Sequence, residues 1–285
     1  MDGVTLLSIL VPTYAYPQGL AHILKRFSSL PRNVELIIFD DSPGEGLGWV
    51  VHAMSDQSTK LWYQHNPSIY GLPLGAGANW NALLDAARGE YCLLLHHDEC
   101  PLDDNFLPEL QFLLSSKLPP DVLMLDLMIV DDCLKPLRRA FPAWLRSFVI
   151  FQAPGYLFRR NVIGPTSTIV IRRAIAPRFN TSLRWLIDVD FYIRLFRAGY
   201  NCQESRDIRI GSVIRKTGSI TSGLLDDLSL IDAEERRTLF ARYPEYWLWL
   251  NANKGKSIRF VENILWIIMR GLCAMLNIFS RHMRG

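Results

Sequence analysis

The N-terminal half of the chain alternates short apolar runs with longer segments whose apolar positions recur at helical spacing. Such runs are typical of parallel strands that are buried on both faces. The predicted strands span residues 6–13, 34–39, 61–64, 91–95 and 122–129. The predicted helices span residues 19–30, 47–54, 76–87 and 104–114. Four crossovers in series predict an open, doubly wound α/β sheet, whose ligands bind beyond the carboxyl ends of the strands.

This alternation ends after residue 130. A stretch rich in proline and arginine covers residues 135–160, and a short apolar segment follows at 168–171. The pattern then predicts a helix over residues 185–197 and a strand over 208–214. We therefore expect a nucleotide-binding α/β half joined to a less regular half that completes a cleft.

The composition supports a globular protein. Of the 285 residues, 49% are hydrophobic and 21% are charged, which is too apolar for a disordered chain. The net charge of +3 gives no electrostatic signature of a nucleic-acid partner. The five cysteines are scattered and form no C-x-x-C pair, which argues against a disulfide framework or a zinc site and favours a reducing cytoplasm. The first residues do not have the pattern of a secretory signal.

Two predicted strands run into motifs that can bind a nucleoside. The first ends in Val-Pro-Thr-Tyr at residues 11–14, and the second continues into Asp-Asp-Ser-Pro-Gly at 40–44. Taken alone, this acidic turn is more often a strand-ending turn than a binding site. At the end of a parallel strand, however, a carboxylate can accept hydrogen bonds from a base or a ribose. A G-x-G-x-x-G and a G-x-x-x-x-G-K-[ST] are both missing, which disfavours hydride-transferring Rossmann enzymes and P-loop proteins.

The fourth predicted strand ends in His96-His97-Asp98-Glu99. Four side chains that can bind a metal, placed directly after a buried strand, indicate a functional site at the sheet edge. The alternative is a helix-capping acid beside two packed histidines.

The order of these motifs resembles the inverting nucleotide-sugar glycosyltransferases of family 2, which have the GT-A fold. Pro-Thr-Tyr at 12–14 precedes Asp-Asp-Ser at 40–42, then Asn-Trp-Asn at 79–81, Ala-Arg-Gly-Glu-Tyr at 87–91 and the acidic tetrapeptide. The resemblance covers residues 5 to about 222. It implies a GT-A domain over residues 1–222, with a doubly wound mixed sheet, followed by a helical region over 223–285. The nucleotide-sugar-binding half would span 1–100, and the acceptor half 101–222.

The resemblance also implies roles for individual residues in donor binding. The implied donor contacts are Pro12, Thr13, Tyr14, Asp41 and Asn81. The tetrapeptide corresponds to the family's metal-binding Asp-x-Asp motif, with His96 in place of the first Asp and Asp98 as the second. A divalent cation is therefore implied, and the imidazole ligand favours Mn²⁺ over Mg²⁺.

The catalytic base implied by the resemblance is Asp188, in the segment Arg-Trp-Leu-Ile-Asp-Val-Asp at 184–190. The alternative is an exposed acid near a helix N-terminus, where the helix dipole favours carboxylates. Asp190 would orient the acceptor or lie behind the residues that contact the substrates, and Thr166 lies in a Gly-Pro-Thr-Ser run that matches the acceptor loop. One departure is the missing histidine after the late strand. Arg215 and Lys216 stand there and can neutralise the diphosphate instead.

The implied activity is inverting transfer of a sugar from a nucleoside diphosphate to an acceptor hydroxyl, in the assembly of cell-surface polysaccharides or lipid-linked glycans. Two alternatives remain open. A sugar nucleotidyltransferase should have a basic, Gly-rich loop after the first strand, and residues 13–17 do not form one. A non-catalytic carbohydrate-binding protein on the same fold is suggested by the altered metal motif.

The basic excess lies in residues 253–285, which hold six basic residues and one acid, whereas the preceding 252 residues hold 25 bases and 27 acids. Residues 260–279 are apolar but are interrupted by Glu262, Asn263, Arg270 and Asn277, so a membrane-spanning helix is disfavoured. At 100° per residue the polar positions share one face. This pattern predicts an amphipathic helix lying on the inner face of the cell membrane. The alternative is a helix packed on the domain or on a second subunit of a homo-oligomer.

Overall fold

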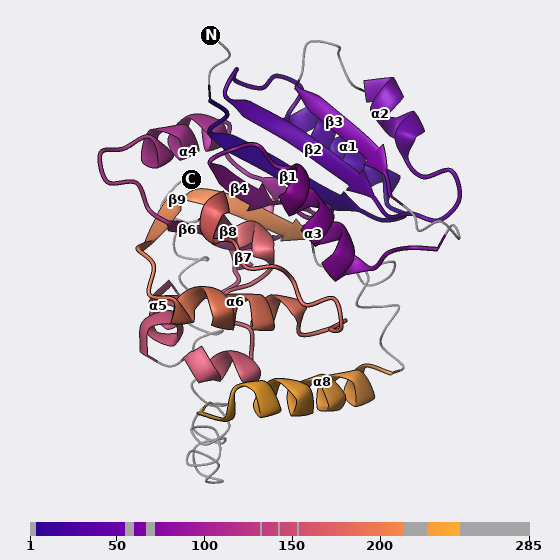
Figure 1. Ribbon diagram of the computed structural model, residues 1–285. Helices are drawn as coiled ribbons and strands as arrows, with labels where there is room; N and C mark the ends of the chain where they lie inside the picture. The colour runs from indigo at the N-terminus through magenta and orange to yellow at the C-terminus, as the bar shows by residue number, and fades with distance from the viewer. Residues whose placement is uncertain are drawn as a thin grey trace.

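The computed structural model describes residues 4–54, 60–66, 72–131, 133–141, 143–152, 154–213 and 227–245. The described strands form one nine-stranded sheet in the order β3-β2-β1-β4-β8-β6-β9-β5, and β7 pairs with β6 outside this path (Figure 1). The strands are β1 (Leu7–Thr13), β2 (Val34–Asp40), β3 (Leu61–His65), β4 (Tyr91–Leu94), β5 (Glu99–Pro101), β6 (Val122–Val130), β7 (Pro136–Arg139), β8 (Ile169–Arg172) and β9 (Cys202–Val213).

The described α-helices include all four that were predicted in the N-terminal half. They are α1 (Pro17–Arg26), α2 (Gly48–Met54), α3 (Ala76–Ala86), α4 (Phe106–Leu114), α5 (Ala143–Gln152), α6 (Ile187–Arg197) and α8 (Leu228–Arg242). Short 3-10 helices span Pro154–Phe158, Thr166–Thr168 and Arg173–Ile175. The predicted helix over 185–197 is confirmed as α6. The strand predicted over 208–214 is longer, because β9 begins at Cys202.

The sheet is mixed because β8 is inserted antiparallel in its middle and because β5 and β7 also pair antiparallel with their neighbours. Strands β3, β2, β1 and β4 run parallel to one another, as the alternating pattern predicted. The apolar segment at 168–171 becomes β8, which pairs antiparallel with both β4 and β6. Strand β6 therefore does not pair with β4, although the pattern placed them in one parallel series. The predicted mixed α/β fold class is confirmed.

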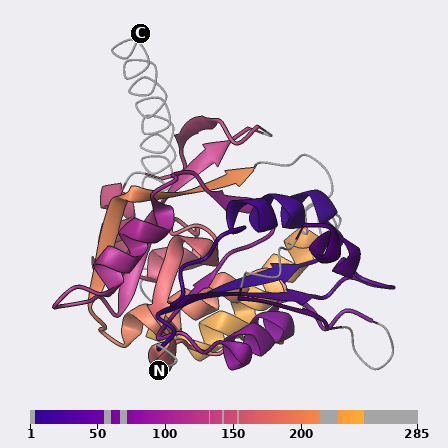
Figure 2. The same cartoon turned by 90° about the horizontal axis from the view of Figure 1, so that it is seen from above.

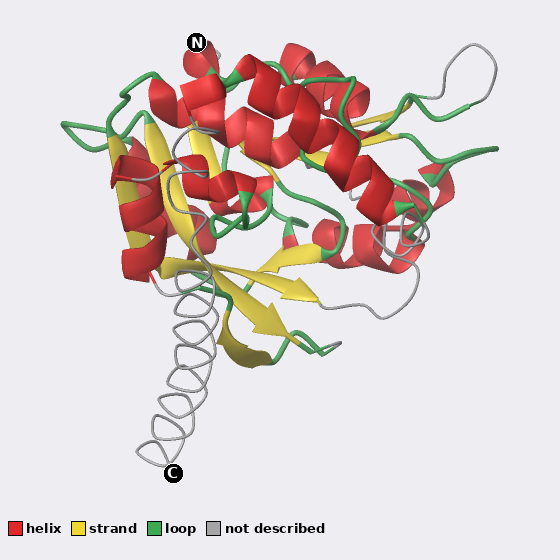
Figure 3. Ribbon diagram, turned by 90° about the horizontal axis from the view of Figure 1, so that it is seen from below, coloured by secondary structure: helices red, strands yellow, loops and turns green. Residues whose placement is uncertain are grey.

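Helices cover both faces of the sheet, as Figures 2 and 3 show. Successive side chains of a strand point to opposite faces of the sheet. In β1, Leu7, Ile9 and Val11 belong to one apolar cluster, and Leu10 belongs to a second one. The first cluster includes side chains of α1, α2 and α4, and the second includes side chains of α3 and α6. Two buried layers thus hold the sheet rigid and leave its carboxyl edge for polar groups.

None of the helices in the described ranges combines the length and the apolar character that crossing a membrane requires. Four cysteines lie in these ranges, at positions 92, 100, 133 and 202, and all four are free thiols. The basic segment 253–285, for which an amphipathic helix was predicted, lies outside the described residues.

Candidate active site

The carboxyl ends of β1, β2 and β4 bring the predicted motifs to one edge of the sheet. Thr13 is in register with Asp40, and the carbonyl oxygen of Thr13 accepts a hydrogen bond from the N–H of Asp41 at 3.0 Å. Strand β4 lies on the other side of β1, and the N–H of Tyr14 donates to Nδ1 of His97 at 3.3 Å. The nucleoside motif and the metal-capable tetrapeptide are therefore neighbours.

The two adjacent acids after β2 have different roles. The buried carboxylate of Asp40 accepts hydrogen bonds from the N–H of Ser42 at 2.9 Å and from the hydroxyl of Tyr63 at 2.8 Å. Asp41 accepts from the N–H groups of Leu74 at 2.6 Å and Gly75 at 2.8 Å, just before α3. Burial raises the pKa of the Asp41 carboxyl above its ordinary value, against the effect of these two N–H groups. Asp40 thus holds the turn, and Asp41 holds the loop before α3.

The other proposed donor contacts differ in exposure. Pro12 and Thr13 are buried, and Thr13 Oγ1 has no hydrogen-bond partner among the described residues. The Tyr14 side chain is 40% exposed beside them. Asn81 is buried, and both ends of its amide bind the backbone of Phe179: Nδ2 donates to the carbonyl at 2.9 Å, and Oδ1 accepts from the N–H at 2.8 Å. The contact that the structure gives Asn81 therefore positions the segment before α6.

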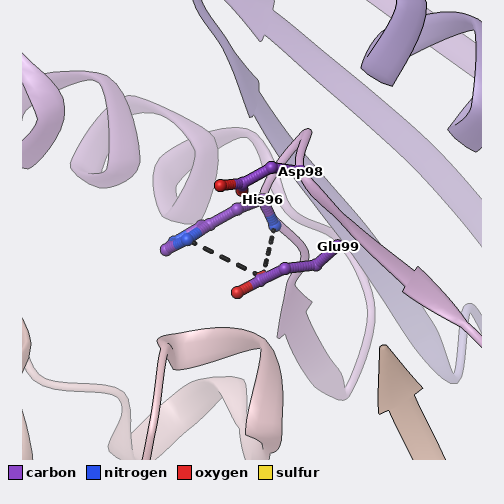
Figure 4. A group of neighbouring side chains, drawn as sticks. All are labelled: His96, Asp98 and Glu99. Carbon is purple, nitrogen blue, oxygen red and sulfur yellow. Dashed lines mark hydrogen bonds and ion pairs between the residues drawn. The ribbon is translucent and has the colours of Figure 1, made fainter. Parts of the chain in front are cut away.

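His96, Asp98 and Glu99 form a cluster that can bind a metal (Figure 4). One ligand atom from each residue lies within 4.8 Å of the other two. Oε2 of Glu99 accepts a hydrogen bond from the His96 N–H at 3.2 Å and lies 3.7 Å from His96 Nδ1. Burial raises the pKa of Glu99 well above its ordinary value, and the nearby Asp98 charge raises it further. One imidazole and two carboxylates are a suitable ligand set for a divalent cation such as Mn²⁺.

The imidazole of His96 is held on two sides. It stacks on Trp80, with ring centroids 5.0 Å apart and an interplanar angle of 24°. Its Nε2 lies 3.0 Å from the buried hydroxyl oxygen of Thr166, which was the predicted acceptor-loop residue. Burial lowers the pKa of His96, which favours the neutral imidazole that metals bind.

Asp188 is the second residue of α6 and is held by two hydrogen bonds. Oδ2 accepts from Nδ2 of Asn161 at 2.5 Å, and Oδ1 accepts from the N–H of Val189 at 2.8 Å. Burial raises the pKa of Asp188 to about 6, although both hydrogen bonds and the neighbouring His96 lower it. A carboxyl with a pKa near neutral can accept a proton from a hydroxyl more effectively than an ordinary aspartate.

A short hydrogen-bonded path joins Asp188 to His96. Asn161 Nδ2 donates to the Gly164 carbonyl at 2.9 Å as well as to Asp188. Asn161 Oδ1 in turn accepts from the N–H of Gly164 at 3.1 Å, so one side chain fixes the turn that leads to Thr166. The loop 161–166 thus lies between the metal-capable cluster and the acid at the start of α6.

The side chain of Asp190 contacts α8, whereas that of Asp188 contacts Asn161. It is 0% exposed, and its carboxylate accepts from the Tyr243 hydroxyl at 2.9 Å and pairs with Arg194 at 2.6 Å and Arg242 at 3.3 Å. These contacts join α6 to α8 and saturate the carboxylate. The carboxylate of Asp190 is therefore engaged by side chains of the protein itself.

Several residues at the site were not assigned roles from the sequence. Glu99 stands in the same tetrapeptide as the two predicted metal ligands, so a signal for it existed. Trp80 stands in the Asn-Trp-Asn motif, which was noted without a role for the tryptophan, and Asn161 had no signal, because its partner Asp188 is distant in the chain. Arg215 and Lys216, which we predicted to neutralise the diphosphate, lie outside the described residues.

Comparison with known proteins identifies the family and the fold. The sequence model of glycosyl transferase family 2 matches residues 8–186, more than half of the chain. The search of curated proteins found no match for the chain. The first 349 residues of TarS from S. aureus, in complex with UDP-GlcNAc, superimpose with a TM-score of 0.58 at 17% identity. The match covers 76% of this chain and 61% of that one.

Two further TarS structures are similar. The complex of residues 1–349 with UDP gives a TM-score of 0.54 at 18% identity and covers 73% of this chain and 60% of that one. The longer S. aureus TarS structure gives 0.55 at 17% identity, with coverage of 73% and 37%. The chain thus spans less than two thirds of each relative. Fold and sequence agree that the chain is a member of glycosyl transferase family 2 with the GT-A fold.

Proposed function

We propose that this protein transfers a sugar from a nucleoside diphosphate donor to an acceptor hydroxyl with inversion. The observation that carries the proposal is the position of Asp188, whose pKa is raised to about 6 and which is linked through loop 161–166 to the metal-capable cluster. A base on one side of the reacting carbon and a charge-stabilising group on the other are what a single displacement requires.

In this mechanism the donor nucleoside lies at the ends of β1 and β2, against Pro12, Thr13, Tyr14 and Asp41. His96, Asp98 and Glu99 would hold a divalent cation, which would supply positive charge to the departing diphosphate. Asp188 accepts the proton of the acceptor hydroxyl at Oδ1 or Oδ2, while Asn161 keeps the carboxylate oriented. Because one displacement occurs, the anomeric configuration inverts.

Uridine nucleotides are the first donors to test, because two of the similar S. aureus TarS structures hold UDP-GlcNAc or UDP. A thermal-shift screen of UDP, GDP, dTDP and CMP, with and without Mn²⁺, should show stabilisation by the cognate nucleotide. Sugar transfer and donor hydrolysis are then measured with the matching sugar nucleotide. Absence of both with every donor would favour a non-catalytic carbohydrate-binding protein.

Replacement of Asp188 by Asn tests the assigned base. The variant should bind the donor within a few-fold of the wild type and lose at least ~10²-fold in turnover, the usual scale for a general base. Asn180→Ala is a matched control, because this asparagine lies in the loop before α6 and its amide oxygen bonds only to Ser182 among the described contacts. Near-normal turnover of the Asp188 variant would remove that residue from the role.

We also propose that the segment 253–285 places the enzyme on the cytoplasmic face of a membrane, near a lipid-linked or cell-surface acceptor. The support is its charge of +5 and its apolar positions at helical spacing. The full chain should float with anionic liposomes, whereas a chain ending near Asn253 should not. Equal behaviour of the two chains would assign the segment to packing or to a homo-oligomer.

A further inference from the structure

Helix α8 contacts the start of α6 through one buried acid. Glu235 is 7% exposed, and its carboxylate accepts hydrogen bonds from three successive N–H groups. The donors are Arg184 at 2.5 Å, Trp185 at 3.0 Å and Leu186 at 2.8 Å. Leu186 is the N-cap residue of α6 and the other two precede it, so none of these N–H groups has a partner within the helix, and the carboxylate satisfies donors that would otherwise be left unpaired.

The burial of Glu235 is unusual for its helix. Helix α8 is rich in charged residues, and among its side chains only Glu235 and Leu239 are buried. Burying a carboxylate is costly unless hydrogen bonds compensate for the lost water. The three N–H donors supply that compensation, so the contact depends on the geometry of both helices.

A second contact fixes the same two helices about one turn further along α6. Asp190 accepts from the Tyr243 hydroxyl at 2.9 Å and pairs with Arg242 at 3.3 Å. Both of these residues lie at the C-terminal end of α8. The Glu235 carboxylate thus holds the three residues just before α6, and the Asp190 carboxylate holds the C-terminal end of α8, so the two contacts lie on either side of Asp188 along the chain. Two separated contacts restrict both the position and the rotation of α6.

We propose that Glu235 is a positioning residue for Asp188 and that α8 is thereby part of the catalytic apparatus, an inference that rests on the proposed function. Asp188 is the second residue of α6 and lies two residues after the last of the three anchored N–H groups. A displacement of about 1 Å in a catalytic group can cost ~10²-fold in rate. The matched family region ends at residue 186, so α8 lies beyond it.

The test compares Glu235→Gln with Glu234→Gln in the full chain. The amide group introduced at position 235 cannot accept from all three N–H groups, and its NH₂ end opposes any that it faces. Glu234 is exposed on the same helix and is the matched control. We expect Glu235→Gln to lower kcat at least 10-fold, to leave donor KM within twofold, and to accelerate hydrogen exchange of amides 184–186 at least 10-fold. Glu234→Gln should change none of these.

Conservative replacement separates positioning from folding. Glu235→Asp keeps the charge on a shorter side chain, so its kcat should lie between those of Glu235→Gln and the wild type. If Glu235→Gln fails to fold, Glu235→Asp is compared with the wild type alone and should have a kcat at least threefold lower at constant donor KM. The proposal is overturned if the Glu235 variants leave kcat unchanged or leave hydrogen exchange of amides 184–186 unchanged. It is also overturned if hydrogen exchange rises throughout the protein while donor binding and kcat are lost equally. An inactive wild type would instead reject the proposed function, while the exchange data would still report on the anchor.

Discussion

Nδ2 of Asn161 lies 2.5 Å from Oδ2 of Asp188 and also donates to the carbonyl oxygen of Gly164. One amide group therefore orients the proposed base and fixes the loop that carries Thr166 toward His96. The hydrogen bond favours the ionised form of Asp188 and opposes the effect of burial on its pKa. The reactivity of the carboxyl thus depends on a residue 27 positions earlier in the chain.

The first prediction concerns pH. Because the base acts in its ionised form and its pKa is about 6, kcat/KM should rise with pH, reach half of its maximum near pH 6 and level off above that. Asn161→Ala removes a hydrogen bond to the carboxylate, so the inflection should move to higher pH. Asn201→Ala is an exposed control. An unshifted profile in Asn161→Ala would show that this amide does not tune the base.

The second prediction concerns how the stability of the folded protein depends on pH. The pKa of Asp188 is raised in the folded protein, so the folded state binds more protons than the unfolded state between about pH 4 and 6. Stability is therefore lost as pH rises through this window, and ionised Asp188 destabilises the fold at pH 7. Asp188→Asn should raise Tm at pH 7.5 and have little effect near pH 4. A gain of about 1 kcal/mol corresponds to roughly 2–4 °C in a protein of this size. The measurement is thermal unfolding of both proteins across this pH range.

Much of the fold was predictable from the sequence because the spacing of apolar residues follows directly from which side chains are buried. The runs that became β1, β2 and β4 are apolar on both faces, and the motifs at their ends had to meet at one edge. The insertion of β8 was not predictable, since it depends on pairing with β4, far away in the chain. The contacts of Asn81 and Asp190 were missed for the same reason. Their residue types suit both a binding site and a buried hydrogen bond, and their partners Phe179 and Tyr243 are distant in the chain.

The third prediction concerns Gly19, in the first turn of α1. A Cβ atom at this position would lie 2.1 Å from the carbonyl oxygen of His97 and 2.3 Å from the ring of Tyr16. Because His97 separates the proposed ligands His96 and Asp98, relief of the clash must shift the metal-capable segment. Gly19→Ala should lose about 1–3 kcal/mol of stability, the usual cost of overpacking, and should weaken Mn²⁺ binding. Chemical unfolding and Mn²⁺ titration measure the two effects. Gln18→Ala, exposed in the same helix, should leave both unchanged.

The last prediction separates the two proposed ways of neutralising the diphosphate. Glu99 is buried, with its pKa raised well above the ordinary value, so Gln in its place resembles the protonated side chain. Its amide oxygen can still accept from the His96 N–H, so the metal-free fold should keep its Tm. The variant lacks a carboxylate for the cation, and its Mn²⁺ affinity should fall at least ~10-fold, with a matching loss of Mn²⁺-dependent stabilisation by the cognate nucleotide.

Asp98→Ala should abolish that stabilisation, whereas Glu45→Gln, at an exposed position in a turn, should leave it intact. Thermal shift in the presence of Mn²⁺ or EDTA gives all three results. If EDTA leaves sugar transfer untouched, the cation is not needed, and the diphosphate charge must be neutralised by Arg215 and Lys216. Arg215→Gln should then reduce donor affinity regardless of Mn²⁺, because a guanidinium forms charge-assisted hydrogen bonds to phosphate that an amide cannot replace.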